Sequence, residues 1–394
     1  MLSSYEPIKF RYESFGGIIQ LEKPSALVYV DRDYMRDLGY PESPLWKADN
    51  PILTAPTEVH LALTRKCDAG CRHCYMDGCN TCDLDKEMGR RGVMAALSKL
   101  AKMKVFHVAM GGGESTQLPW LFEVAHVARS LGMIPNLTTN GFSITNLDEA
   151  KKFRVFGQVN VSIDGVGPLY AALRGFDRFD EAVRALKLLR KAGVRMGINC
   201  VVCRDNFGGL DDLFALSKKL RVKQLELLRF KPAGRAANLD SDYVRKDLSH
   251  KQAWDFFPKI MKLAKKFKTP LNIDCSFTPH IYAHDPDKEK LEYFGVFGCH
   301  GGNMLCGVHP DGQAVACSFA HGENRRVDDM EKWWASDDAF NAFRHWEEAA
   351  PRPCADCKYL SLCRGGCHVV SEHVNGDIFS PDPGCPKVAD YLKS

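Results

Sequence analysis

Six short apolar or β-branched segments alternate with helical patterns between residues 57 and 230, and this alternation limits the fold more than any other feature. The expected strands are EVHLALT (58–64), VFHVAM (105–110), MIPNLTT (133–139), QVNVSID (158–164), VRMGINCVV (194–202) and KQLELLRF (223–230). Helical periodicity fills the intervals, for example over 86–103 and 179–193. Alternating strands and helices form parallel sheets with crossover helices. We therefore predict an α/β fold, a partial (β/α)6 barrel of the TIM type that is open on one side.

The rest of the chain divides around this barrel. Residues 1–54 are expected to be an irregular N-terminal extension, with VYV at 28–30 as a short strand. The barrel is expected over 55–245 and an amphipathic helical bridge over 246–295. Residues 296–394 are dense in Gly, Pro and Cys. We expect a small cysteine-rich domain there, with little apolar core and a dependence on bound metal.

The overall charge excludes some classes of partner. The chain has 394 residues and a net charge of +4, which favours neither nucleic acid nor a membrane surface. It contains no run of about 18 apolar residues and no secretory signal at its start. We therefore expect a cytoplasmic protein. Its sixteen cysteines are many for a reducing compartment, where metal binding or catalysis is a better explanation than disulfides.

Three of these cysteines follow the first predicted strand with the spacing C-x3-C-x2-C. Cys67, Cys71 and Cys74 thus lie in a loop at the carboxyl end of a barrel strand, where barrel enzymes place their active sites. Three thiolates can hold three irons of a [4Fe–4S] cluster and leave the fourth iron open to a small molecule. The alternative is a zinc site, but zinc usually takes four protein ligands in paired C-x2-C motifs.

This motif, with Tyr75 after its third cysteine, resembles the signature of the radical S-adenosylmethionine (SAM) superfamily. The resemblance implies an enzyme in which SAM binds the open iron. An electron from the cluster then cleaves SAM to methionine and a 5′-deoxyadenosyl radical, which abstracts a hydrogen atom from the substrate. The cofactor supplies the chemistry, and the protein positions and shields it.

A second motif supports the resemblance. MGGGES follows the second strand, and Gly112, Gly113 and Glu114 resemble the GGE motif that meets the methionine amino group of SAM. Glycine permits the close backbone approach that such a contact needs. The family often has proline next, where this chain has Ser115.

Further SAM contacts are implied by position along the later strands. Ser162 in VSIDG and Arg174 in LRG resemble the residues that contact the ribose and the carboxylate. Asn199, Val201 and Leu228, on the fifth and sixth strands, are expected neighbours of the ribose and adenine. For these last three, ordinary core packing is an equal alternative.

The C-terminal cysteines resemble the SPASM extension of radical SAM enzymes. They follow its pattern of C, then G-x4-C, then C-x2-C-x5-C-x3-C, then C. The resemblance implies two auxiliary [4Fe–4S] clusters, and so three clusters in all. The first would be held by Cys299, Cys306, Cys317 and Cys367. The second would be held by Cys354, Cys357, Cys363 and Cys385. A zinc-ribbon-like site is the alternative for these cysteines.

Five cysteines remain outside these sets. Cys79 and Cys82 are expected to be redox-active or simply unpaired. Cys200 and Cys203 lie on the fifth strand and are expected to be buried core thiols. Cys275 follows the bridge helix, and we predict that it reaches the cavity as a hydrogen-atom donor or an acid–base group.

The resemblance implies post-translational modification of a ribosomally made peptide, by crosslinking, epimerisation, excision or oxidation. KPAGRA (231–236) resembles a stretch of several peptide-modifying members, whereas Ser318 replaces the Asp typical of sulfatase maturases. Expected partners are a precursor peptide, a separate leader-peptide-binding protein or a minimal strand near Phe15–Val30, and a flavodoxin or ferredoxin. The alternatives are an enzyme of small-molecule or cofactor biosynthesis, with a closed polar pocket, and a non-catalytic iron–sulfur or zinc protein.

Overall fold

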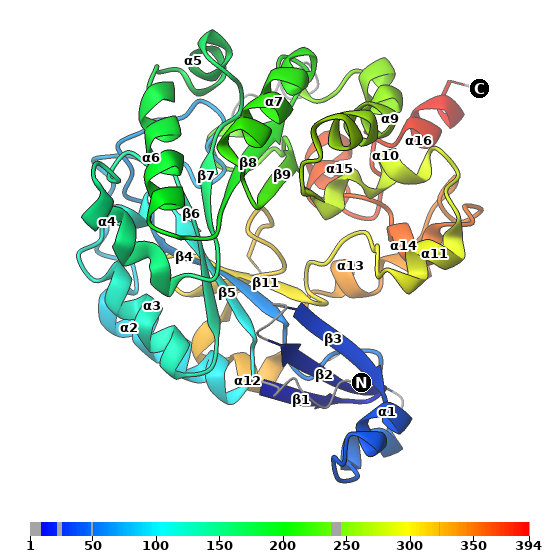
Figure 1. The fold of residues 1–394 in the computed structure, drawn as a ribbon. Helices are drawn as coiled ribbons and strands as arrows, with labels where there is room; N and C mark the ends of the chain where they lie inside the picture. The colour runs from blue at the N-terminus through cyan, green and yellow to red at the C-terminus, as the bar shows by residue number, and fades with distance from the viewer. Residues whose placement is uncertain are drawn as a thin grey trace.

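Parallel strands form the centre of the molecule (Figure 1). The computed structural model describes residues 9–21, 26–48, 50–237, 246–322, 324–336 and 338–393. The expected domain boundary at residue 245 lies outside these ranges. Within them, ten strands form one sheet in the order β10-β9-β8-β7-β6-β5-β4-β11-β12-β13. Strands β4 to β9 span Glu58–Thr64, His107–Gly112, Ile134–Thr139, Val159–Ser162, Met196–Val202 and Gln224–Arg229.

These six strands are the six predicted from the sequence, and neighbouring strands are parallel throughout. The helices that follow them are α2 Gly89–Lys102, α3 Leu121–Ser130, α4 Leu147–Lys152, α5 Pro168–Arg174, α6 Phe179–Lys191 and α7 Leu210–Leu220. These helices lie around the outside of the curved sheet (Figure 1). Their buried apolar residues join the core of the sheet, as the periodicity requires. The prediction of an α/β fold is confirmed.

Both edges of the predicted six-stranded sheet are extended by short strands. β10 (Leu271–Ile273) pairs in parallel with β9. At the other edge, β11 (Leu305–Val308) pairs in parallel with β4, and β12 (Gln313–Val315) and β13 (Arg325–Arg326) continue antiparallel. The unpaired backbone groups of β4 and β9 are thereby satisfied. The cysteine-rich region is therefore continuous with the barrel sheet.

The described residues 9–21 and 26–37 form regular structure, so the expectation of an irregular extension is wrong there. β1 (Lys9–Glu13), β2 (Gly16–Leu21) and β3 (Ala26–Asp31) form an antiparallel sheet, followed by α1 (Arg32–Asp37). The buried Arg11 guanidinium ties this sheet to the start of β4, donating to the carbonyls of Ala55 at 2.7 Å and Pro56 at 3.0 Å. The small sheet thus lies at the amino end of the barrel strands. Its contacts with the barrel stabilise it, although its sequence shows only a weak strand pattern.

The expected bridge helix is α9 (His250–Phe267), which packs against α7. A capping box fixes its start, because the Ser249 side chain accepts from the backbone N–H of Gln252 while the Gln252 side chain accepts from that of Ser249. Two short helices follow, α10 Thr278–Tyr282 and α11 Lys288–Tyr293.

The C-terminal region has a substantial apolar core, contrary to expectation. Its helices are α12 Met330–Trp333, α13 Asn341–Arg344, α14 Leu360–Cys363, α15 His368–Asn375 and α16 Pro386–Tyr391. Trp334, Phe340 and Trp346 are almost completely buried there. These aromatic residues are scattered along the sequence without periodicity, so the pattern of the chain did not reveal that they share a core.

One buried arginine links the barrel to the last segment of the chain. Arg229, at the end of β9, donates to Asp382 at 2.6 Å and to Asp247 at 2.7 Å, and its side chain is fully buried. Asp382 also accepts from the backbone N–H groups of Cys367 at 2.9 Å and Gly384 at 2.9 Å. In the part of the chain that the structure describes, no helix is long and apolar enough to cross a membrane.

Candidate active site

The first cysteine motif forms the loop after β4, at the carboxyl end of the barrel. Two of its sulfurs receive donors from the protein, since the Gly78 N–H lies 3.3 Å from Cys74 Sγ and Arg174 Nη1 lies 3.6 Å from Cys71 Sγ. Burial raises the pKa of the Cys67 thiol to about 11. Iron must therefore displace protons when it binds these thiols. The Arg174 guanidinium and the Gly78 N–H beside the sulfurs favour the thiolate state that iron requires.

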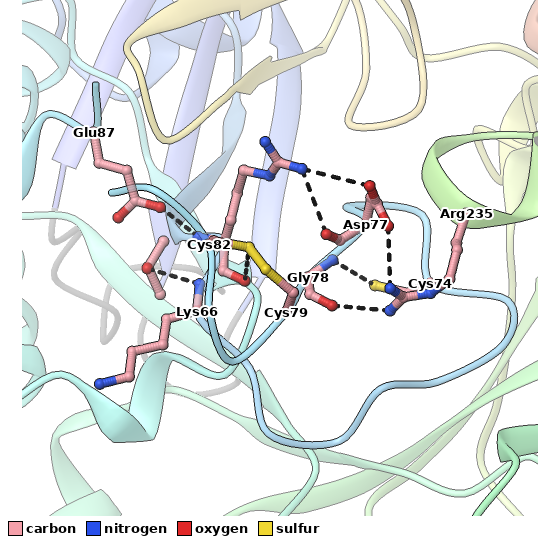
Figure 2. The surroundings of a disulfide bond; sticks show 10 residues. Lys66, Cys74, Asp77, Gly78, Cys79, Cys82, Glu87 and Arg235 are labelled. Carbon is pink, nitrogen blue, oxygen red and sulfur yellow. Dashed lines mark hydrogen bonds and ion pairs between the residues drawn. A yellow bond between two sulfur atoms is a disulfide. The ribbon is translucent and has the colours of Figure 1, made fainter. Parts of the chain in front are cut away.

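Cys79 and Cys82 form a disulfide directly beside this loop (Figure 2). The backbone N–H of Cys67 donates to the carbonyl of Cys79 at 2.9 Å, and that of Cys79 donates to the carbonyl of Arg65 at 3.1 Å. Arg235, of the KPAGRA stretch, holds the same loop through the carbonyls of Cys71 and Gly78. Of the two expectations for Cys79 and Cys82, the unpaired state is therefore wrong, and a redox-active pair stays a prediction. The C-x2-C spacing alone does not distinguish two free thiols from a disulfide.

The glycine-rich turn after β5 lies against the cysteine loop. Gly113 N–H donates to the carbonyl of Thr64 at 2.6 Å, and Glu114 N–H donates to that of Lys66 at 2.7 Å. A Cβ atom on Gly113 would lie 2.2 Å from the Lys66 carbonyl oxygen. Only glycine fits this approach. The structure thus brings together two of the sequence-predicted motifs.

Replacing Gly113 by alanine is therefore expected to displace the cysteine loop and to reduce SAM cleavage by at least about tenfold, since an ångström-scale displacement of reacting groups costs about this much or more. Gly208→Ala is the matched control, because a Cβ at Gly208 meets no atom within 4 Å. The measurement is the initial rate of 5′-deoxyadenosine formation at equal iron content. Equal rates for the two variants would contradict the structural role given to Gly113.

Glu114 is buried with its carboxylate held by neighbours from β6. It accepts from Thr139 Oγ1 at 2.7 Å, from the Asn140 N–H at 2.7 Å and from Thr116 Oγ1 at 2.7 Å. Burial raises its pKa despite these donors. The side chain is thus fixed in position at the carboxyl end of β5 and β6, beside the loop that carries the three cysteines.

Arg174 is also buried, although its sequence alone would favour a surface position. Its Nε lies 2.9 Å from Asp164, which also contacts His73 Nε2 at 3.1 Å and accepts from the Val201 N–H at 2.8 Å. The charge of Arg174 keeps the pKa of Asp164 well below its usual value against the opposing effect of burial. Asp164 escaped the sequence analysis, although its place after a strand in VSIDG marks it as a polar residue at the active end.

Ser162 is the last residue of β7 and precedes this Asp164 network by two positions. Val201 lines a side cavity of about 460 Å³ together with residues of the network. The other residues of that cavity include Arg72, His73, Asp164, Cys203 and Arg235. Cys200 and Cys203 are buried, as predicted.

A second cavity of about 460 Å³ occupies the inside of the barrel. Four predicted SAM-binding residues line it, namely Tyr75, Gly112, Asn199 and Leu228. The C-terminal region contributes Val308, His309, Ser318 and Phe319. The ring of Phe319 packs on that of Tyr75, with centroids 4.9 Å apart. The cavity therefore runs from the glycine-rich turn into the barrel and is closed on one side by the cysteine-rich region.

Cys275, the predicted catalytic residue, is not among the residues that line this cavity. It begins a single helical turn after β10 and lies beside the ion pair of Lys231 and Asp274, close enough to Cys299 for their charges to interact. Burial is the main cause that raises its pKa well above the usual value.

Charge interactions connect C-terminal cysteines within each of the two sets proposed from the sequence. Burial, followed by the charges of Cys317 and Cys367, raises the pKa of Cys299. Burial and the charge of Cys317 also raise the pKa of Cys306. The Cys306 Sγ lies 3.4 Å from the carbonyl oxygen of Val315. In the second set, burial and the neighbouring thiols raise the pKa of Cys363 well above its usual value. Those thiols are Cys385, Cys354 and Cys357.

Thiols gathered in this way fit iron–sulfur clusters, which take cysteine thiolates as ligands. All the C-terminal cysteines of both sets are free of disulfides. Among the described residues, no group of three or more His, Cys, Asp or Glu lies close enough together to hold a single metal ion.

Known proteins resemble this chain over most of its length. The mycofactocin maturase MftC of Mycobacterium tuberculosis is 28% identical over 343 residues, which cover 84% of this chain and 83% of that protein. The AdoMet-dependent heme synthase of Oleidesulfovibrio alaskensis is 26% identical over 340 residues, covering 82% and 85%. The crystal structure of Streptococcus suis SuiB bound to its precursor peptide SuiA is similar in fold, with a TM-score of 0.71, 16% identity and coverage of 95% and 98%.

The sequence model of the radical SAM superfamily matches residues 61–215, which hold the cysteine loop and the glycine-rich turn. The family implies a [4Fe–4S] cluster and SAM. The loop of Cys67, Cys71 and Cys74 offers the three thiols that such a cluster needs, in contact with the turn that resembles the SAM site. The chain therefore contains a radical SAM domain over residues 61–215.

Proposed function

We propose that this radical SAM enzyme modifies a residue of a ribosomally made precursor peptide. The carrying observation is the cavity, which joins the predicted SAM site to residues of the cysteine-rich region. Two of the similar proteins support this proposal, because MftC is named a maturase and SuiB was crystallised with a precursor peptide.

Within this proposal, Cys67, Cys71 and Cys74 hold the cluster that binds SAM. The surrounding SAM contacts are Tyr75, Gly112, Gly113, Glu114, Ser162, Arg174, Asn199, Val201 and Leu228. Bound SAM supplies the 5′-deoxyadenosyl radical, and the barrel wall keeps water away from it. Arg174 is a suitable partner for the SAM carboxylate, because it is buried and already held by Asp164.

The three-cluster arrangement is part of the same proposal. Cys299, Cys306, Cys317 and Cys367 would hold one auxiliary cluster. Cys354, Cys357, Cys363 and Cys385 would hold the other. Fully ligated clusters carry electrons. Reconstituted protein should then contain about twelve irons per chain, the sum of three [4Fe–4S] clusters.

Two further partners are proposed. A flavodoxin or ferredoxin would deliver the electron that cleaves SAM. The leader part of the peptide would bind either a separate protein or the sheet β1–β3, by adding a strand to it. Within the described residues, β3 pairs only with β2, so its other edge is available for such pairing.

The test is anaerobic incubation of the reconstituted enzyme with SAM, dithionite and synthetic peptides encoded beside its gene. Modification predicts a change in one peptide that depends on SAM and on the enzyme, seen as a change in mass or, for an epimerisation, as a shift in chromatographic retention at equal mass. Peptides that all return unchanged, while SAM is cleaved, would contradict the proposal. The change in mass also distinguishes a crosslink or oxidation, which removes two hydrogens, from an epimerisation, which leaves the mass unchanged.

A small-molecule substrate is the second candidate. It is favoured by the several polar side chains that line the barrel cavity and by the similarity to the heme synthase of Oleidesulfovibrio alaskensis. Under this candidate, SAM cleavage would be stimulated by a porphyrin or another compact compound and not by peptides.

A further inference from the structure

The wall of the barrel cavity carries a carboxylate that the family resemblance does not use. Glu226 lies on β9 with its side chain directed to the cavity, on the same face as Gln224 and Leu228. Successive residues on one face of a strand are about 7 Å apart. Glu226 therefore lies about that far below Leu228, deeper in the barrel than the predicted SAM edge. A substrate that reaches SAM from inside the cavity would lie between the depth of Glu226 and that of Leu228.

The immediate partners of Glu226 are neutral. Asn160 Nδ2 lies 3.1 Å from Glu226 Oε2 and 2.6 Å from Asn199 Oδ1. Asn199 in turn donates to Thr138 Oγ1 at 3.2 Å. A chain of hydrogen bonds thus connects the carboxylate with a predicted SAM neighbour, without any cation in contact with the carboxylate.

The other acidic groups near the cavity already have partners. Asp274 is paired with the Lys231 ammonium group. His60 Nε2 lies 3.3 Å from Glu58 Oε1, while its Nδ1 lies 3.0 Å from Ser318 Oγ. Both nitrogens of His60 are therefore engaged by the protein. The titratable or charged residues that line the cavity are Glu58, His60, Tyr75, His107, Arg195, Glu226 and His309.

The surroundings also give Glu226 a suitable proton affinity. Burial, followed by the charges of Asp274 and Glu58, raises its pKa to about 7, against the opposite effects of His60 and Lys231. A general base works best with a pKa near the working pH. Such a group can take a proton in one step and release it to water afterwards.

We propose that Glu226 is the catalytic base of this enzyme, which accepts the proton that the substrate loses after hydrogen abstraction. The inference rests on the proposed peptide function. The substrate C–H bond gives its hydrogen atom to the 5′-deoxyadenosyl radical. The substrate radical would then pass one proton to the Glu226 carboxylate. An oxidised cluster held by the C-terminal cysteines would supply the acceptor for the second electron. A new bond or double bond in the peptide completes this two-electron oxidation.

The test is the ratio of modified peptide to 5′-deoxyadenosine in Glu226→Gln and wild-type enzyme. We expect Glu226→Gln to keep forming 5′-deoxyadenosine with peptide present, while the ratio falls about 10²-fold or more, the usual effect of removing a general base. Glu226→Asp should restore part of the ratio because it keeps an ionisable carboxylate. Glu289→Gln, an exposed change of the same kind on α11, serves as the control.

The pH dependence provides a readout that a structural role would not change. The base acts when ionised, so the wild-type ratio should rise as the pH increases through about 7, and Glu226→Gln should lack this rise. A wild-type ratio in Glu226→Gln would overturn the inference but leave the peptide function standing. Loss of 5′-deoxyadenosine together with product would also overturn it. No modified peptide from the wild-type enzyme would instead contradict the proposed function.

Discussion

Replacing Cys67, Cys71 and Cys74 together by alanine is expected to reduce 5′-deoxyadenosine formation to the level of a protein-free control. Without these thiolates no cluster can present an open iron to SAM. Iron content should fall by about four per chain, since one [4Fe–4S] cluster is lost. The C-terminal cysteines are carried by other elements with their own aromatic core. Their clusters are therefore expected to persist.

The measurements are iron analysis, the visible absorption of the clusters and chromatography of 5′-deoxyadenosine. Cys200→Ala is the control, because this buried thiol lies on β8 outside all three expected cluster sets. It should retain its iron and most of its SAM cleavage. SAM cleavage by the triple variant at a rate near that of the wild type would refute the role of the loop.

Asp382→Ala is expected to lower the free energy of unfolding by about 3–5 kcal/mol, the usual cost of removing one partner from a buried ion pair. It leaves the fully buried Arg229 with Asp247 as its remaining carboxylate partner among the described residues. It also removes the acceptor of the Cys367 N–H, so the loop that carries this cysteine loses its anchor. We therefore expect reduced iron retention in the C-terminal region as well.

Thermal and denaturant unfolding of the reconstituted protein provide the measurement. Asp356→Ala is the matched control, because Asp356 forms an exposed ion pair with Arg352 and should unfold close to wild type. If the two variants unfold alike, Arg229 and its aspartates do not join the barrel to the C-terminal region in the way described above.

Much of the barrel was predictable because each strand and helix shows its apolar pattern within one short segment of the sequence. Strands such as Glu58–Thr64 show their apolar residues within one segment, and the cysteine and glycine motifs follow strands directly. The edge strands were missed since three or four residues, as in Leu271–Ile273, carry too little pattern. Their pairing depends on partners far away in the sequence.

The sequence predicts those site residues that belong to a motif with fixed spacing. It does not predict those whose role depends on neighbours brought together by folding. The three cysteines and Gly113 were found by motif. In contrast, Asp164 and Glu226 acquire their roles from what surrounds them after folding. Glu226 is one polar residue in a strand, and only the parallel register places it opposite Asn199 and close to Asn160.

The most direct test of the account is hydrogen transfer from a precursor peptide deuterated at its carbon atoms. The enzyme, SAM and dithionite are mixed anaerobically with this peptide, and the mass of the 5′-deoxyadenosine is measured. Abstraction from the peptide predicts 5′-deoxyadenosine one mass unit heavier, in step with modification of the peptide. Unlabelled 5′-deoxyadenosine alone, with the same peptide shown to be modified, would contradict radical abstraction from its carbon atoms.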